Sequence, residues 1–453
     1  MKAYDLKPSY ENLLNTLLED TIDRRADVFR FVEVLNTVEG NLSIALDGNW
    51  GSGKTFFVKQ TKMVIEAHNE NITCDCVENK EKIISSYAAF CKEGASKLQP
   101  QVCVYYDAWQ NDNDDDPILS LVYTILNSVD SDYNFKKSSF LKCAASIMEF
   151  FTGKDWNKII DNLRGDDPLE NIKSNKSIET SIKDFFNELL PEKGERLIIF
   201  TDELDRCKPS YAVHLLERIK HYFENERITF VFSVNLNELQ HTICKYYGGD
   251  FNASKYLDRF FDLRIGLPMP NLQKFYYSIR FGDYYVYEKI CRAVIKKYNF
   301  ELRMISKYLK LCRCAYNPSL KRDFIFPDEK AMNFILLYFV PIALGLKISD
   351  LRRYEEFVQG KNYMPLVEIA NEINIHLFDY MLLETETYST EEVRKTVVTV
   401  ENKLREVYDT IFTAYGPGNH SKAIGGMDFN WHCKNEFLRV VDLMSPYNDF
   451  EAD

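Results

Sequence analysis

The chain contains the stretch Ile44-Ala45-Leu46-Asp47-Gly48-Asn49-Trp50-Gly51-Ser52-Gly53-Lys54-Thr55, an apolar run that ends in the pattern G-x-x-x-x-G-K-[ST]. Its three glycines let backbone N–H groups approach phosphate oxygens without a Cβ in the way. In such loops the lysine reaches the β- and γ-phosphates, and the hydroxyl of the next residue ligates Mg²⁺. The context fits this reading, because a strand is predicted before the loop at 42–46 and a helix after it at 57–67.

We therefore expect this loop to bind a nucleoside triphosphate together with Mg²⁺; the alternative is a glycine-rich turn that matches by chance. The helix that opens at Phe56 would turn the positive end of its dipole toward the phosphates. The expected nucleotide-binding residues are Gly48, Asn49, Trp50, Gly51, Ser52, Gly53, Lys54, Thr55 and Phe56.

A second motif, Leu197-Ile198-Ile199-Phe200-Thr201-Asp202-Glu203, is a buried-strand run that ends in two carboxylates. Attack on a γ-phosphate depends mainly on positioning and charge neutralisation. We expect Asp202 to hold Mg²⁺ with Thr55, and Glu203 to polarise the attacking water. An ordinary strand end is the alternative when this motif is taken alone.

Two further candidates follow. Asn235 ends the apolar run 229–235, where the carboxyl edge of a sheet would meet the γ-phosphate. It either orients the attacking water or caps the next helix. Arg259 is a candidate arginine finger toward the nucleotide of a neighbouring subunit, and pairing with Asp258 or Asp262 is equally open.

The motifs together resemble the KAP family of P-loop NTPases. The resemblance rests on the loop at 48–55, on Tyr106-Asp107-Ala108-Trp109-Gln110, on Asp202-Glu203-Leu204-Asp205-Arg206-Cys207 and on Lys255-Tyr256-Leu257-Asp258-Arg259, and it covers roughly residues 5–310. It implies an α/β P-loop fold of the additional-strand type, with a parallel sheet in the order 5-1-4-3-2. It also implies that Arg303 is a lid arginine that touches the nucleotide.

Three departures from the family pattern matter. Glu203 stands where the family usually has Asp, and Asn235 where Asp is common; both choices are closer to ring-forming AAA-type ATPases and favour hydrolysis. Many family members also carry two transmembrane helices between the nucleotide motifs. A span needs about 20 apolar residues, and the interval 56–196 has only short apolar pieces. We expect no membrane segment there, and a buried core helix at 334–348.

Composition points to a cytoplasmic protein. The start of the chain lacks an apolar signal region, and the eleven cysteines are scattered without usual zinc spacing. The net charge of −12 disfavours a general nucleic-acid surface, although basic residues recur at helical spacing from Lys296 to Arg313.

We predict four regions: an N-terminal helical segment (1–40), a P-loop core (41–270) with a helical insertion at about 111–195, a helical lid (271–313) and a C-terminal helical domain (314–453). Apolar residues at three- and four-residue steps support the helical regions.

The sequence thus predicts an ATPase that drives or regulates assembly of a multiprotein complex. Because soluble bacterial members of the resembled family look like components of anti-phage systems, we expect a homo-oligomer that works with a partner effector protein in antiviral defence. The alternatives are an ATP-dependent switch or scaffold with little turnover, and a motor stimulated by nucleic acid.

Overall fold

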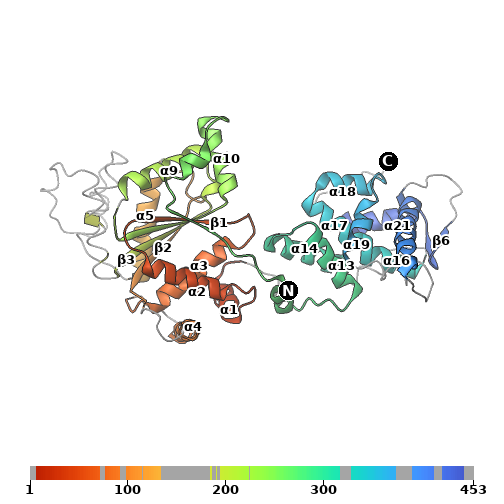
Figure 1. The fold of residues 1–453 in the computed structure, drawn as a ribbon, viewed down its shortest axis with the longest axis horizontal. Helices are drawn as coiled ribbons and strands as arrows, with labels where there is room; N and C mark the ends of the chain where they lie inside the picture. The colour runs from red at the N-terminus through yellow and green to blue at the C-terminus, as the bar shows by residue number, and fades with distance from the viewer. Residues whose placement is uncertain are drawn as a thin grey trace, which may run out of the picture. The chain divides into compact units, whose positions relative to one another are not determined.

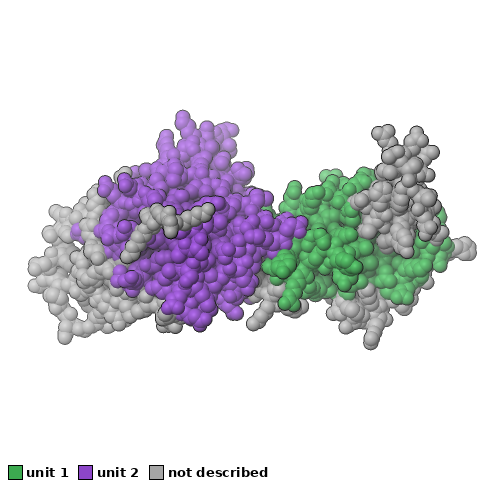
Figure 2. Space-filling model, turned by 60° about the horizontal axis from the view of Figure 1, so that its bottom comes forward, with its two compact units in different colours: residues 1–6, 276–453 green, residues 7–275 purple. Residues whose placement is uncertain are grey.

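The structure is a computed structural model, which describes residues 7–71, 77–91, 98–114, 116–133, 184–185, 190, 194–223, 225–316, 328–373, 390–412 and 421–442. The described residues form two compact units, which Figure 2 draws in purple and green. We call them the sheet unit (residues 7–275) and the helical unit (residues from 276 onward) and describe each by itself.

The elements of the sheet unit, in chain order, are α1 (Tyr10–Glu19), α2 (Arg25–Thr37), β1 (Leu42–Asp47), α3 (Lys54–His68), α4 (Val77–Phe90), β2 (Gln101–Asp107), α5 (Pro117–Tyr133), β3 (Arg196–Asp202), the 3₁₀ turn η2 (Leu204–Arg206), α9 (Pro209–Tyr222), β4 (Ile228–Val234), α10 (Leu236–Tyr247), α11 (Ala253–Leu257), β5 (Leu263–Gly266) and α12 (Leu272–Ser278), which runs across the unit boundary.

Five parallel strands form the sheet in the order β2-β3-β4-β1-β5. The strand that precedes Asn235 lies between the strands that precede Gly48 and Glu203, so the predicted P-loop fold and strand order are confirmed. The register brings the carboxyl ends together, because Asp107 pairs with Asp202 and Asp202 pairs with Ser233. The central strands β3 and β4 are buried along nearly their whole length because both faces of the sheet are covered there, whereas the edge strand β5 is largely exposed.

The helices lie on both faces of the sheet, with α1 to α4 on one side and α5, α9 and α10 on the other (Figure 1). Alternate strand residues point to opposite faces. Within β1, accordingly, Ile44 and Leu46 pack in the core that contains Phe31 of α2, whereas Ala45 packs in the core on the other face.

The predicted N-terminal helical segment forms α1 and α2, which belong to the sheet unit. Ser9 caps α1, whose Leu13, Leu14 and Leu17 are buried, and α2 packs against α3. Within the predicted insertion the structure describes α5, while most of the remainder, residues 134–183, lies outside the described residues.

The elements of the helical unit are α13 (Val286–Lys297), α14 (Leu302–Ala315), α16 (Glu329–Phe334), the π-helical segment η3 (Ile335–Phe339), α17 (Val340–Ser349), α18 (Leu351–Val358), α19 (Met364–Ile373), α21 (Thr390–Phe412), β6 (Lys422–Ile424), β7 (Met427–Phe429) and α22 (His432–Asp442).

The helical prediction for this unit is confirmed, and the structure adds the short antiparallel hairpin β6–β7. Its turn is Gly425-Gly426, where both residues have positive φ, a conformation that glycine adopts without strain. Strands of three residues are too short to show an alternating pattern in the sequence.

One continuous helical stretch, Glu329–Ser349, is long and apolar enough to cross a membrane by length and composition alone. In this protein 72% of its most apolar window is buried, and α17 packs against α13, α14, α18 and α22. The expectation of a core helix at 334–348 agrees with this packing.

Candidate functional site

The loop 48–53 joins β1 to α3 in a tight, fixed conformation. The Gly48 N–H donates to the Val234 carbonyl of the neighbouring strand at 3.1 Å. A Cβ at Gly48 would meet Ser52 Oγ at 3.0 Å and Leu267 Cβ at 3.2 Å, so the backbone passes too close to its neighbours for a larger residue. Gly51 and Gly53 have φ angles of 86° and 97°, a backbone conformation that residues with a side chain rarely adopt.

Lys54 begins α3, and its side chain folds back over the loop. Its Nζ donates to the carbonyl oxygens of Gly48 at 2.5 Å and Asn49 at 3.2 Å. Burial lowers the pKa of Lys54, which the nearby carboxylates of Asp205 and Asp202 oppose. The ammonium group is therefore held inside the loop, in the position from which a P-loop lysine contacts phosphate.

Asp202 connects three motifs at the end of β3. Its Oδ2 accepts hydrogen bonds from Thr55 Oγ1 at 2.7 Å and from the Tyr105 hydroxyl at 2.9 Å, and its Oδ1 accepts one from the Glu203 N–H at 3.1 Å. The structure thus brings together the two residues predicted to hold Mg²⁺. A hydroxyl beside a carboxylate is the oxygen donor set that Mg²⁺ prefers, so these residues fit the ion.

Glu203 follows directly and has φ of 59°, a left-handed conformation that is strained for a glutamate. Its Oε2 forms an ion pair with Arg206 Nη1 at 3.1 Å, and both side chains are partly exposed. Backbone strain of this kind gathers at functional sites, where the surrounding structure maintains it. Glu203 therefore stands next to the Mg²⁺ residues, but its carboxylate is engaged by a cation.

Two tryptophan rings lie near Arg206. Its guanidinium carbon lies 5.8 Å from the ring centre of Trp50 in the loop and 5.6 Å from that of Trp109, which follows β2. The Trp50 indole N–H donates to Asp205 Oδ2 at 2.5 Å. Burial raises the pKa of Asp205, an effect that the hydrogen bond from Trp50 and the charge of Lys54 oppose.

Asn235 follows β4 at the same edge of the sheet. Its side-chain oxygen accepts hydrogen bonds from the backbone N–H groups of Asn237 at 3.1 Å and Glu238 at 3.3 Å, and so caps α10. Of the two roles that the sequence left open for Asn235, the structure shows helix capping. Its role toward a water molecule stays a prediction.

The two candidate arginines, Arg259 and Arg303, are both exposed. Arg259 is exposed after α11, and its two proposed local partners are engaged elsewhere: Asp258 pairs with Arg264 at 2.5 Å, and Asp262 accepts a hydrogen bond from the Ser43 N–H at 2.8 Å. Arg303 is exposed on α14 in the helical unit. The roles of both in nucleotide contact stay predictions.

Three residues near the site received no individual role from the sequence. Tyr105 and Asp107 lie at the carboxyl end of β2, and burial raises the pKa of Asp107. Lys59 lies one helical turn beyond Thr55, with its Nζ 4.1 Å from the Tyr105 ring centre, and burial lowers its pKa. The available signal was the position of Asp107 at the end of an apolar run, the same signal that identified Asp202.

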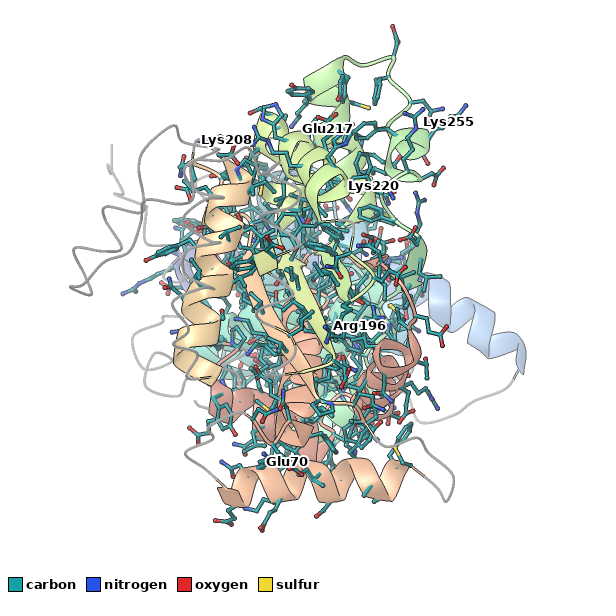
Figure 3. All side chains as sticks on the ribbon, turned by 90° about the vertical axis from the view of Figure 1, so that its left-hand side faces the viewer. Glu70, Arg196, Lys208, Glu217, Lys220 and Lys255 are labelled. Atoms are coloured by element: carbon teal, nitrogen blue, oxygen red, sulfur yellow. The ribbon has the colours of Figure 1, made fainter. Side chains whose placement is uncertain are left out.

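Arg24 links the N-terminal helices to the loop. It is only 3% exposed, its Nη1 donates to the Ser52 carbonyl at 2.7 Å, and its Nη2 donates to the Pro268 carbonyl just after β5. Figure 3 labels a residue near each end of β3: Arg196 lies at the amino end of the strand, and Lys208 lies beyond its carboxyl end, where Asp202 and Glu203 are found.

The comparison with known protein families agrees with this geometry. The profile of the KAP family P-loop domain matches residues 28–278, which is more than half of the 453 residues. No curated protein matches the chain. The matched range contains the phosphate-binding loop, the acidic strand end and Asn235, all at one edge of a sheet with the predicted strand order. The chain therefore belongs to the KAP family of P-loop NTPases.

Proposed function

We propose that the protein binds ATP with Mg²⁺ and hydrolyses it. The observation that carries the proposal is the hydrogen bond between Thr55 Oγ1 and Asp202 Oδ2, because it joins the loop to the acidic strand end in the arrangement that an Mg²⁺–phosphate complex requires. Glu203, the next residue, places a second carboxylate beside it. ATP is the default nucleotide, since no Asn-Lys-x-Asp guanine motif follows the sheet.

Each residue at the strand ends has a chemical task in this proposal. The loop N–H groups and Lys54 bind the β- and γ-phosphates, and Thr55 and Asp202 hold the metal, which neutralises charge on the transferred phosphoryl group. Glu203 accepts a proton from the attacking water. Asn235, which directly follows the neighbouring strand β4, positions that water with the side-chain amide group that remains after capping.

The biological setting is also a proposal. We infer a cytoplasmic protein, which the free thiols of the described cysteines support, since disulfides are rare in reducing compartments. On the resemblance to soluble bacterial members of the KAP family, we further propose a homo-oligomer that assembles or regulates a partner effector protein in anti-phage defence. In this arrangement Arg259 reaches the nucleotide of a neighbouring copy, and Arg303 contacts the nucleotide from the lid.

A second candidate function is an ATP-dependent switch with little turnover of its own. The Glu203–Arg206 ion pair favours it, because an engaged carboxylate is a poor acceptor for the proton of water. In that case binding of ATP, rather than its hydrolysis, would carry the signal to a partner.

The deciding experiment measures ATP turnover and nucleotide binding by calorimetry on three full-length variants and the wild type. Lys54→Ala should abolish detectable binding, since it removes the phosphate-directed charge. Glu203→Gln should keep binding but slow turnover about 10²–10⁴-fold. Lys62→Ala is the matched control on the same helix, where the lysine pairs with Glu66, and it should preserve both properties.

Unchanged binding in Lys54→Ala would rule out the loop as the phosphate site. Normal turnover in Glu203→Gln would assign the base to another group. A wild-type protein that binds nucleotide but does not turn it over would favour the switch.

A further inference from the structure

Arg206 connects the loop, the acidic strand end and the block after β2. Its guanidinium pairs with Glu203 at 3.1 Å and lies near the indole rings of both Trp50 and Trp109, 5.8 and 5.6 Å from their centres. Aromatic faces hold a guanidinium by cation–π attraction and still leave its N–H groups available in the plane. The rings therefore orient the Arg206 side chain, and its N–H groups can still exchange one hydrogen-bond acceptor for another.

The two indole rings near Arg206 do not depend on the Glu203–Arg206 ion pair for their positions. Trp50 is anchored through its indole N–H to Asp205, which is 5% exposed, and Trp50 itself is part of the phosphate-binding loop. Trp50 and Trp109 are 46% and 49% exposed, so this side of the loop borders solvent. An arriving nucleotide would reach the guanidinium without displacing any core residue.

The charges around the loop also favour an anion near Arg206. The Lys54 ammonium group bonds to the loop carbonyls of Gly48 and Asn49, and the Arg206 guanidinium lies 5.8 Å from the ring centre of Trp50 in the same loop, so both cations border the loop. A γ-phosphate lies between such cations in P-loop sites, and its oxygens match the planar fork of a guanidinium better than a single carboxylate oxygen does. ATP would therefore compete with Glu203 for Arg206.

We propose that Arg206 is a γ-phosphate sensor, which pairs with Glu203 in the nucleotide-free protein and transfers to the γ-phosphate when ATP binds. The exchange releases the Glu203 carboxylate toward the attacking water. ADP lacks the γ-phosphate and leaves the ion pair intact. The proposal rests on the proposed function, since it assumes that the loop 48–55 binds ATP, and it adds a residue to which that function gave no role.

The test is a double-mutant cycle on binding, with Mg²⁺ and either AMP-PNP or ADP, for wild type, Glu203→Gln, Arg206→Gln and the double variant. Glu203→Gln weakens the pair that ATP must break, so it should tighten AMP-PNP binding about fivefold, the scale of one partly exposed ion pair. The affinity for ADP should change less than twofold. In the Arg206→Gln background, Glu203→Gln should give no gain.

An equal gain for ADP and AMP-PNP would overturn the proposal, and so would a gain that persists in the Arg206→Gln background. Arg206→Lys provides a second variant should Arg206→Gln fail to fold. It keeps the charge but loses the planar fork, so it should retain only part of the preference for AMP-PNP over ADP. Full retention would also count against the sensor.

Tryptophan fluorescence gives a readout that a purely structural ion pair would not move. Transfer of the guanidinium should change the emission of Trp50 and Trp109 with AMP-PNP but not with ADP, and Arg206→Gln should abolish the difference. Identical spectra with both nucleotides in the wild type would overturn the proposal. Failure of the proposed function has another signature, because the wild type would then bind neither nucleotide.

Discussion

At the scale of single residues, one carboxylate oxygen has two donors. Asp202 Oδ2 accepts hydrogen bonds from both Thr55 and Tyr105, while the other oxygen is occupied by the next backbone N–H. The carboxylate therefore cannot rotate without losing several bonds. Tyr105 comes from β2 and Thr55 from α3, so the orientation of this proposed Mg²⁺ ligand depends on two separate elements.

We predict that Tyr105→Phe raises the Mg²⁺ concentration needed for half-maximal ATP turnover by about two- to tenfold, the equivalent of one hydrogen bond. The ring stays in place while the hydroxyl that orients Asp202 is removed. The measurement is turnover against Mg²⁺ concentration at saturating ATP.

Tyr106→Phe is the matched control for this prediction. The Tyr106 hydroxyl bonds with that of Tyr211 in the core on the other face of the sheet, so its loss should lower thermal stability but leave the Mg²⁺ requirement unchanged. An unchanged Mg²⁺ requirement in Tyr105→Phe would show that Tyr105 does not orient the metal site.

Residue types and spacing predicted the part of the site that lies along continuous motifs. The loop 48–55 and the pair Asp202-Glu203 are such motifs, because phosphate binding needs consecutive backbone groups and the acidic pair ends a single strand. The Arg24–Ser52 bond and the contacts of Arg206 with two indole rings join distant segments. An arginine gives no sign in the sequence of the carbonyl or ring that it will meet.

At the scale of elements, the N-terminal helices are joined to the phosphate loop by a buried cation. Arg24 precedes α2 and donates to carbonyls of the loop and of the segment after β5. The two carbonyls come from opposite ends of the sheet unit's sequence. Movement of α2 would therefore change the shape of the phosphate site.

We predict that Arg24→Met lowers the free energy of unfolding of the sheet unit by about 2–4 kcal/mol and weakens nucleotide binding. Methionine keeps the apolar stem but leaves one buried and one partly buried carbonyl without their charged donor, and bonds from charged groups contribute about 1.5–3 kcal/mol each. Denaturant unfolding and calorimetry measure the two effects.

Arg30→Met in α2, the helix that Arg24 directly precedes, is the control, since Arg30 is exposed and pairs with Asp27 at the surface. It should change stability by less than about 1 kcal/mol. Equal effects of the two substitutions would mean that the bonds of Arg24 do not support the loop.

The order of the strands was predicted through family resemblance rather than through periodicity. Strands β3 and β4 are buried along nearly their whole length, so their sequences carry no record of which neighbour lies on which side. The short hairpin β6–β7 had no comparable motif to indicate it. Helices such as α14, with one clearly apolar face, were predictable from spacing alone.

At the scale of the whole molecule, the exposed Arg259 bears on whether one chain makes a complete site. The pairing of Asp258 with Arg264 and of Asp262 with the Ser43 N–H leaves neither proposed local partner bonded to it. Arg259 follows α11 and precedes β5, which is an edge strand of the sheet. A neighbouring copy is the remaining proposed partner for this side chain.

We predict that ATP turnover per molecule rises with protein concentration and that Arg259→Ala lowers it about 10³-fold, the scale of a lost arginine finger, while nucleotide binding persists. Light scattering with and without nucleotide reports the assembly in parallel. Arg264→Ala, which removes a nearby exposed arginine from its local ion pair, is the control and should retain the concentration dependence. Turnover independent of concentration would remove the finger role.

The stretch Glu329–Ser349 has a consequence for experiments that locate the protein in cells. The stretch is as long and apolar as a membrane span because most of it is buried among helices of its own unit. Those helices come both before it in the sequence (α13, α14) and after it (α18, α22). A truncated or misfolded chain that lacks α22 would expose this apolar surface. Recovery of such a chain with membranes would then report lost packing partners rather than an anchor, and only the intact chain gives a meaningful fractionation.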